Sequence, residues 1–465
     1  MRVMPISDSP WAPTGFGTNT KNISCIFAEA GHKVGYGGCQ NPKHDPDWKT
    51  PWPLGDEKKT QSFELLPIMH PGQEKFGEKS FDQWCKLFKP DLILTHLDIQ
   101  MFQYITERKK PMTANIPLWN DKGEMLTRKE RTNLMNKLFK EVQSGPPWKI
   151  ASIIPIDGQP SIPGWADVLK LIDYPIAMAR YGQKVMREDF SGLGEEWHNN
   201  VTFLPHGVDC GLFKPKIVDK PDNAFVVGTV ARNQHRKNIP RLMKAFKHFV
   251  DKEKLSPDQA RLMLHMDWND YMGWNIQYMA EYYDMADYLI PQMMGAIDKG
   301  EAPTEEEMVD IYNMMDVFAL PTAGEGFGIP TLEALACGKP VVITNYTTSY
   351  ELIKAEDPYT CDPPLWPQGK EAQNGRDHLI EDDWSDRGCL VPYKDMWWDT
   401  PQRAAPQRGI VSEVAMAEAF SEYYHNPKKR LEHGKNARDF ALEFYDWNTV
   451  LSQKWLDFAE RVTKG

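Results

Sequence analysis

Length, composition and charge already limit what this chain can be. Its 465 residues are more than one hydrophobic core supports, and its charged and apolar fractions, 26% and 41%, are those of an ordinary globular protein. The formal net charge of -11 gives no bulk attraction to nucleic acid or to an anionic membrane, so such a partner would need a local basic patch. We therefore expect two domains of roughly 200 residues each.

Location and redox state follow from the same simple features. No apolar run approaches the roughly 18 residues of a membrane-spanning helix, and the N-terminus begins with a strand-like segment in place of a signal peptide. The seven cysteines are scattered without a Cys-x-x-Cys pair, which is typical of reduced thiols. We expect a cytoplasmic protein with no transmembrane segment, and no cluster of His and Cys suggests a metal site.

In chain order, the first half alternates between short apolar strands and helical segments. A Gly/Pro-rich loop at 8–17 precedes a predicted helix at 18–30. The predicted strands are 1–7, 89–96, 149–157 and 174–179. This alternation is typical of a parallel sheet with crossover helices.

The second half repeats the pattern. Strands are predicted at 224–230, 261–266 and 317–320, and Asn238 can cap the helix that follows the first of them. The apolar residues of that helix recur at helical spacing: Leu242, Met243, Phe246, Phe249 and Val250. A second α/β unit is therefore expected.

The most informative segment, residues 322–342, follows the strand at 317–320. It places Glu325 in a Gly-rich turn and Glu333 in a helix that Pro330 opens and Gly338 closes. A strand, a Gly-rich turn and a helix N-terminus form an anion site, because free N–H groups and the helix dipole point to one place. Two carboxylates beside it would repel a bare phosphate, but they suit a phosphate that carries a polyol on each side. That is the chemistry of a nucleotide sugar.

The run Glu325-Gly-Phe-Gly-Ile-Pro-Thr-Leu-Glu333-Ala-Leu-Ala-Cys-Gly-Lys-Pro-Val-Val resembles the Glu-x7-Glu signature of retaining glycosyltransferases of family four. The elements Pro-Thr-Gly-Phe-Gly at 13–17 and Pro-His-Gly-Val-Asp at 205–209 also resemble that family, so the resemblance spans most of the chain. It implies the GT-B fold, an α/β architecture of two Rossmann-like domains whose parallel sheets face a deep cleft.

The resemblance also implies a division of the chain. Residues 1–205 would form the acceptor domain, with an insertion at about 104–148. Residues 206–445 would form the nucleotide-sugar donor domain, with an insertion at about 355–409. Residues 446–465 would form a helix that crosses back to the first domain.

Roles at the donor site follow from the same resemblance. Glu325 would hold hydroxyls of the transferred sugar, and Glu333 would accept bonds from the ribose diol. Phe327 and Gly328 would offer backbone amides. The N-terminal Gly15 and Gly17 would lie near the donor phosphates, because their missing Cβ atoms let backbone amides approach a ligand; the competing interpretation is a plain turn.

A cationic loop follows the strand at 224–230. Arg232 and Lys237 lie beyond the carboxyl end of this strand, where open α/β sheets bind ligands, and two fixed cations can neutralise a diphosphate. They match the family's pyrophosphate-binding Arg and Lys, with Arg236 a possible substitute for either. A solvated basic loop is the alternative.

One position departs from the family. Many members carry a His after a central strand of the first domain, over the transferred sugar, whereas the strand here ends at Asp157. This carboxylate could bind sugar hydroxyls or help to deprotonate the acceptor. His96 and Asp98, at the end of another strand, are rivals for the role, and a plain hydrogen-bonded strand end remains an alternative for each.

The expected reaction is transfer of a hexose-type sugar, with retention, from a UDP-, GDP- or ADP-linked donor to an acceptor hydroxyl, without a metal. The acceptor stays open between a glycan, a small molecule and a modified nucleic acid base. Basic residues in 104–148 could contact an anionic surface or nucleic acid, although a solvated helix face explains them as well, and the Trp-rich 355–409 could bind sugar or an oligomer partner. The other hypotheses are a GT-B sugar phosphorylase or nucleotide-sugar epimerase, and a non-catalytic nucleotide-sugar-binding protein.

Overall fold

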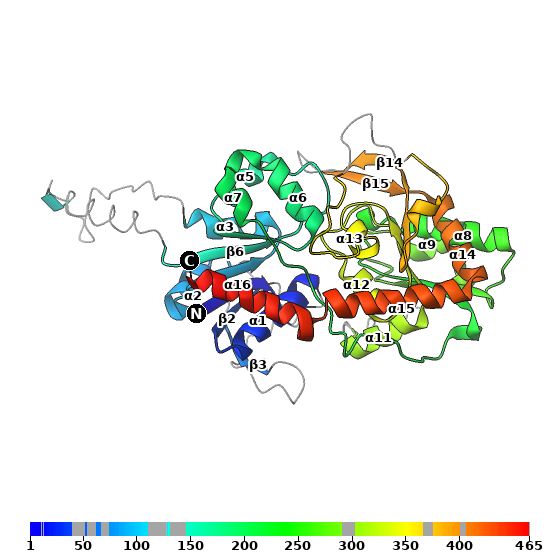
Figure 1. Ribbon diagram of the computed structural model, residues 1–465, viewed down its shortest axis with the longest axis horizontal. Helices are drawn as coiled ribbons and strands as arrows, with labels where there is room; N and C mark the ends of the chain where they lie inside the picture. The colour runs from blue at the N-terminus through cyan, green and yellow to red at the C-terminus, as the bar shows by residue number, and fades with distance from the viewer. Residues whose placement is uncertain are drawn as a thin grey trace.

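The computed structural model describes residues 1–10, 12, 14–39, 52–53, 62–66, 74–109, 127, 129–130, 146–290, 303–365, 375–399 and 406–464. Two α/β units lie next to each other along the long axis of the molecule (Figure 1). Most of the predicted basic insertion at 104–148, including its helix face, lies outside the described residues.

The N-terminal unit is built on one mixed sheet with the strand order β3-β4-β2-β1-β5-β6-β7-β8. Every neighbouring pair is parallel except β3 and β4. The strands are β1 Arg2–Asp8, β2 Lys33–Cys39, β3 Trp52–Pro53, β4 Ser62–Leu65, β5 Leu92–His96, β6 Lys149–Ile154, β7 Tyr174–Ala177 and β8 Thr202–Phe203. The central strands are continuous buried runs, because helices cover both faces of a parallel sheet.

Helices connect these strands: α1 Gly15–Glu29, α2 Phe81–Phe88, α3 Ile99–Glu107, α5 Ala166–Leu169, α6 Arg180–Asp189 and α7 Glu195–Asn200. Helix α1 begins three residues earlier than the sequence predicts. The Thr14 hydroxyl caps it by accepting from the Gly17 amide at 3.1 Å, so Gly15 and Gly17 form its first turn and no longer belong to a loop. A Cβ on Gly17 would lie 2.6 Å from the Ser9 carbonyl oxygen, which explains the glycine there.

The C-terminal unit has a five-stranded parallel sheet in the order β10-β9-β11-β12-β13. Its strands are β9 Phe225–Val230, β10 Ala260–His265, β11 Val317–Leu320, β12 Val341–Thr344 and β13 Gly388–Val391. Its helices are α8 Ile239–Glu253, α9 Ile276–Tyr282, α11 Glu305–Met314, α12 Ile329–Ala336, α13 Ser349–Ile353, α14 Glu413–His425 and α15 Pro427–Phe444. Apolar residues of α8, among them Phe246 and Phe249, pack in a buried cluster with residues of this sheet, as their spacing predicts.

Two local expectations were wrong. The Asn238 side chain makes no capping bond to α8; its amide instead lies 3.4 Å from the Gly409 carbonyl oxygen. The segment 355–409 is not wholly an insertion, because β13 within it is a strand of the main sheet. What projects from the sheet is an antiparallel hairpin of β14 Tyr393–Trp398 and β15 Gln407–Val411 (Figure 1).

The chain passes between the two units at two places that lie against each other. Val208 and Asp446 form a parallel bridge: the Val208 amide donates to the Tyr445 carbonyl oxygen at 2.9 Å, and the Trp447 amide donates to that of Val208 at 3.1 Å. After a π-helical turn at Trp447–Leu451, α16 Ser452–Lys464 packs on α1, where Trp455 meets Phe27 edge to face. Figure 1 shows α15 and α16 running along both units.

Candidate active site

The loop between β11 and α12 carries Glu325 into the space between the two units. Its sharp path needs glycine, because Gly324 has φ +152° and Gly328 has φ +100°. The Glu325 amide donates to Oγ1 of Thr347 at 3.0 Å, and the residue is 8% exposed. The loop therefore presents a nearly buried carboxylate in a fixed position.

Two cations compensate that carboxylate. Nζ of Lys237 forms an ion pair with Oε1 of Glu325, and Nη1 of Arg236 lies 3.3 Å from Oε2. Arg236 also donates to the Gly324 carbonyl oxygen at 2.8 Å. Burial alone would raise the pKa of Glu325, but Lys237 and Arg236 lower it to about 2. Burial, and then the charge of Arg236, lowers the pKa of Lys237 to about 8, so both partners are charged at neutral pH.

Arg232, the other predicted cation, lies apart from this cluster. Its Nε donates to Oδ2 of Asp270 at 2.9 Å, and its side chain is 59% exposed. The structure thus brings Lys237 and Arg236 to Glu325 and leaves Arg232 on an outer ion pair. Arg236, considered only as a substitute from the sequence, occupies the inner position.

Glu333 lies on α12, where its Oε2 accepts a hydrogen bond from the Tyr312 hydroxyl at 2.6 Å. Burial raises the pKa of Glu333 to about 7, although the Tyr312 bond acts in the opposite direction. Within the described residues, this carboxylate forms no ion pair with a cation. It can therefore accept hydrogen bonds from neutral donors such as hydroxyl groups.

Two helix N-termini meet at the cleft, one from each unit. A Cβ on Gly15, the first residue of α1, would lie 2.8 Å from Cδ1 of Ile329, the first residue of α12. Among the described residues, the amides of Phe327 and Gly328 donate to no backbone acceptor. Converging N–H groups and two helix dipoles favour an anion at this point.

Asp157, after β6, faces the Glu325 loop from the N-terminal unit. Arg408 of β15 holds it: Nη1 of Arg408 lies 3.2 Å from Oδ1 of Asp157 and also donates to its carbonyl oxygen. Nε of Arg408 binds Oδ2 of Asp399 at 2.9 Å. Gly324 fits against Asp157, since a Cβ there would lie 2.1 Å from the Asp157 carbonyl oxygen. The two units are therefore in contact at this point, with a hairpin of the C-terminal unit fixing an N-terminal carboxylate.

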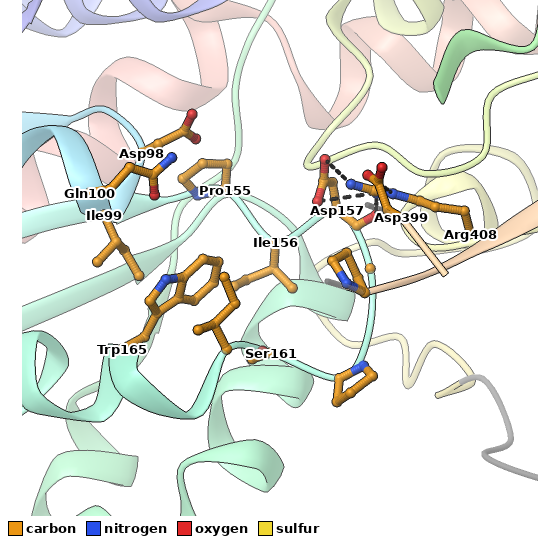
Figure 2. A pocket seen from close by; sticks show the side chains of 14 residues that line it. Asp98, Ile99, Gln100, Pro155, Ile156, Asp157, Ser161, Trp165, Asp399 and Arg408 are labelled. Carbon is orange, nitrogen blue, oxygen red and sulfur yellow. Dashed lines mark hydrogen bonds and ion pairs between the residues drawn. The ribbon is translucent and has the colours of Figure 1, made fainter. Parts of the chain in front are cut away.

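A cavity of about 220 Å³ opens beside this ion triad. Figure 2 shows Asp98 and Gln100 on one side, Asp157, Asp399 and Arg408 on the other, and Trp165 and Ile156 between and below them. Burial and then the charge of Asp157 raise the pKa of Asp98 to about 6. Asp98 thus shares a cavity with Asp157, and it lies at the N-cap of α3 without a capping bond.

His96, the other rival of Asp157, does not line this cavity. It is fully buried, with Nδ1 3.0 Å from Oγ1 of Thr20 and its ring 5.1 Å from that of His206. The His206 ring in turn lies 5.1 Å from that of Phe327, so these residues form a packed floor under the Glu325 loop. Burial lowers the pKa of both imidazoles, that of His206 to about 3, which keeps them neutral.

Arg408 and Asp399 are site residues that the sequence did not reveal. They lie in a segment rich in Trp, Pro and charges, more than 240 residues after Asp157, and no local pattern links them to it. Within the described part of the chain, no group of three or more His, Cys, Asp or Glu side chains is arranged for a metal ion. No described helix combines the length and apolar character that crossing a bilayer demands.

Part of the chain is similar to a known protein family. Residues 224–365 match the family described as glycosyl transferases group 1. The chain is 28% identical over 130 residues to O-antigen chain mannosyltransferase B of Escherichia coli, covering 28% of this chain and 30% of that protein. It is 27% identical over 242 residues to D-inositol 3-phosphate glycosyltransferase of Corynebacterium jeikeium, covering 48% of this chain and 51% of that protein. The matches therefore span only about a third to a half of these relatives.

Solved structures match over the whole length. Sucrose-phosphate synthase from Thermosynechococcus elongatus superposes with a TM-score of 0.64 at 15% identity, covering 100% of both chains. Anabaena Alr3699/HepE, in complex with UDP and glucose, gives a TM-score of 0.59 at 14% identity, also covering 100% of both chains. The predicted GT-B fold is confirmed. Residues 224–365 thus match the glycosyl transferases group 1 family, and they do so within a chain that has the two-domain GT-B fold.

Proposed function

We propose that this protein is a retaining glycosyltransferase that moves a hexose-type sugar from a nucleotide diphosphate sugar to an acceptor hydroxyl. The observation that carries the proposal is the contact of Glu325 with Lys237 and Arg236 at the N-terminus of α12, inside the segment that matches the family. UDP complexes of proteins with the same fold support a nucleotide-linked donor.

The donor's charge and its polyol groups find separate partners here. The N–H groups of Phe327 and Gly328 and the N-terminus of α1 at Gly15 would surround the diphosphate. Gly17 would support the same turn, because its amide is bonded to the Thr14 hydroxyl. Glu333, with a pKa near 7 and a Tyr312 hydroxyl fixing one oxygen, would take the two ribose hydroxyls. Glu325 would accept hydrogen bonds from hydroxyls of the transferred sugar, because Lys237 and Arg236 keep its carboxylate ionised.

Bond cleavage would leave charge on the diphosphate, and Lys237 and Arg236 are placed to stabilise it. Arg232 would join them by exchanging its ion pair with Asp270 for the phosphate. The acceptor hydroxyl would then attack the anomeric carbon from the face that the leaving group vacates and pass its proton to the departing phosphate oxygen on that face, which retains the configuration. Asp157 faces the same space and would orient hydroxyl groups.

A thermal-shift panel of UDP-, GDP- and ADP-linked sugars tests the donor. A donor at a hundred times its dissociation constant stabilises the fold by about 2.7 kcal/mol, which raises the melting temperature by about 5–10 °C. Nuclear magnetic resonance of the product's anomeric proton then tests retention. A panel in which no nucleotide sugar raises the melting temperature refutes the proposal, and an inverted product refutes the retaining mechanism.

A further inference from the structure

The cavity beside Asp157 has a wall from each unit. Ser161 and Trp165 come from the segment after β6, and Asp98 comes from the start of α3. The opposite wall is Arg408 and Asp399 of the β14–β15 hairpin. This cavity lies against the Glu325 loop through the Gly324–Asp157 contact, so it borders the proposed donor site.

Most of the charged side chains that line this cavity are acidic. Of its described lining residues, three are aspartates and one is a cation. That cation, Arg408, is already bound by Asp157 and Asp399 and is 5% exposed. Arg236 does not line the cavity, although its Nε reaches Oδ2 of Asp157 at 4.0 Å, and its Nη1 is bound at Glu325. No described lining residue therefore offers a free positive charge, and Asp98 adds a carboxyl that forms no ion pair within the described residues, although the nearby charge of Arg236 favours its ionised form.

The rest of the lining is suited to a ring with an apolar face and polar edges. Trp165 and Ile156 form an apolar surface below the carboxylates (Figure 2). Ser161 is 8% exposed, and its Oγ has no hydrogen-bond partner within the described residues. A buried hydroxyl without a partner is costly, and a ligand with a polar edge would satisfy it. A volume of about 220 Å³ is of the order of one sugar ring.

Resting on the proposed function, we propose that this cavity is the acceptor site and that it holds an uncharged sugar ring while excluding phosphorylated acceptors. The ring would stack on Trp165, with its hydroxyls donating to Asp98 and Asp157 and one of its oxygens accepting from Ser161. A phosphate would meet three aspartates and no free cation among the described lining residues, and like charges in a partly buried site are mutually destabilising.

The hairpin gives the site its specificity. Because Arg408 is bound by both Asp157 and Asp399 and leaves no free N–H fork for a ligand, β15 closes the cavity and keeps it unsuitable for anions. Asp98 is the one of the three carboxyls that Arg408 does not bind. Its pKa near 6 means that it is largely ionised at pH 7 and accepts hydroxyl bonds there.

The inference is tested by calorimetry. The protein is first saturated with the nucleotide that the thermal-shift panel selects. The probes are the methyl α-glycosides of glucose, mannose, galactose and N-acetylglucosamine, each paired with its 6-phosphate. We expect at least one neutral glycoside to bind about ten-fold or more tightly than its 6-phosphate. Asp98→Asn and Trp165→Ala should each weaken that binding about five-fold or more, with the nucleotide-induced thermal shift unchanged.

One matched control is Asp82→Asn, an exposed carboxylate of α2. The other is Trp398→Ala, an exposed Trp of the same hairpin that does not line the cavity. Neither should change glycoside affinity. Tighter binding of a 6-phosphate, no binding of any neutral glycoside to nucleotide-loaded protein, or equal losses in the controls would overturn the inference. Absence of any nucleotide-sugar thermal shift is a separate result, which overturns the proposed function itself.

Discussion

Replacement of Glu325 by Gln removes the carboxylate that compensates Lys237 and Arg236. Lys237 is 6% exposed, and breaking a buried ion pair by removing one partner costs about 3–5 kcal/mol. We expect the lower end, about 3 kcal/mol, for two reasons. Arg236 keeps its bond to the Gly324 carbonyl oxygen, and Lys237, whose pKa burial already lowers to about 8, can release its proton.

The corresponding fall in melting temperature is about 6–12 °C at pH 7 for a unit of this size. It should shrink above pH 8, where Lys237 loses its proton in both proteins. Turnover should fall by at least about a hundred-fold, whereas UDP affinity should change by less than about three-fold because the phosphate-facing cations remain.

Differential scanning calorimetry, UDP titration and product formation measure the three quantities, with Glu305→Gln as the control, since this exposed carboxylate reaches only Lys21. Full activity in Glu325→Gln refutes the assigned role. A loss of UDP affinity equal to the loss of turnover would show that Glu325 organises the phosphate site and does not hold the sugar.

Three further predictions follow from the interface and from the donor site. Glu351 accepts hydrogen bonds from the Arg180 and Tyr181 amides, and burial raises its pKa from 4.5 to about 7. Its carboxyl therefore binds a proton more tightly in the folded state, so the stability that it contributes below pH 4.5 is lost as the pH rises through 7. Urea unfolding at pH 5 and pH 8 should show wild type losing about 2.5 kcal/mol more than Glu351→Gln, and parallel losses contradict this. Gly324→Ala is strained at φ +152°, and its Cβ would collide with the Asp157 carbonyl oxygen of the opposite unit. We expect kcat to fall about a hundred-fold with UDP affinity kept, and an unchanged kcat would exclude that contact from the active state. Tyr312→Phe removes about 1 kcal/mol of hydrogen bonding and raises the pKa of Glu333 further. Donor affinity should therefore fall roughly five-fold, and more at pH 6 than at pH 8. A pH-independent affinity equal to that of wild type argues against a role of Glu333 in binding the ribose.

The part of the candidate site around Glu325 was largely predictable because its signals are local. Strand β11, the Gly-rich turn and α12 follow one another within 317–336, and Pro330 and the left-handed Gly338 mark the helix ends as the sequence predicts. Lys237 was also placed correctly beyond β9, since a parallel sheet gathers the carboxyl ends of its strands at one edge. The helix start at Gly15 was misplaced only because the Thr14 cap was not recognised.

The surroundings of Asp157 could not be predicted, because its contacts are long-range. Asp157 was proposed as a carboxylate that binds sugar hydroxyls or helps to deprotonate the acceptor, and nothing in the sequence indicated that Arg408 binds it from a hairpin whose place depends on the packing of two sheets. The choice between Arg232 and Arg236 depends on the loop that carries Asp270, whose ion pair holds Arg232 outside the cluster. Tertiary partners of this kind leave no periodic trace in a sequence.

The paired crossings at Val208 and Asp446 determine how the molecule can move. The two crossing segments are hydrogen-bonded to each other, and the Cys210 amide also donates to Asp446 at 3.0 Å. They therefore act as one hinge and not as two independent linkers. The units can then open by swinging about this single line, and sliding past each other would break its bonds. Substrate entry and product release would thus follow a hinge motion whose axis is built into the backbone.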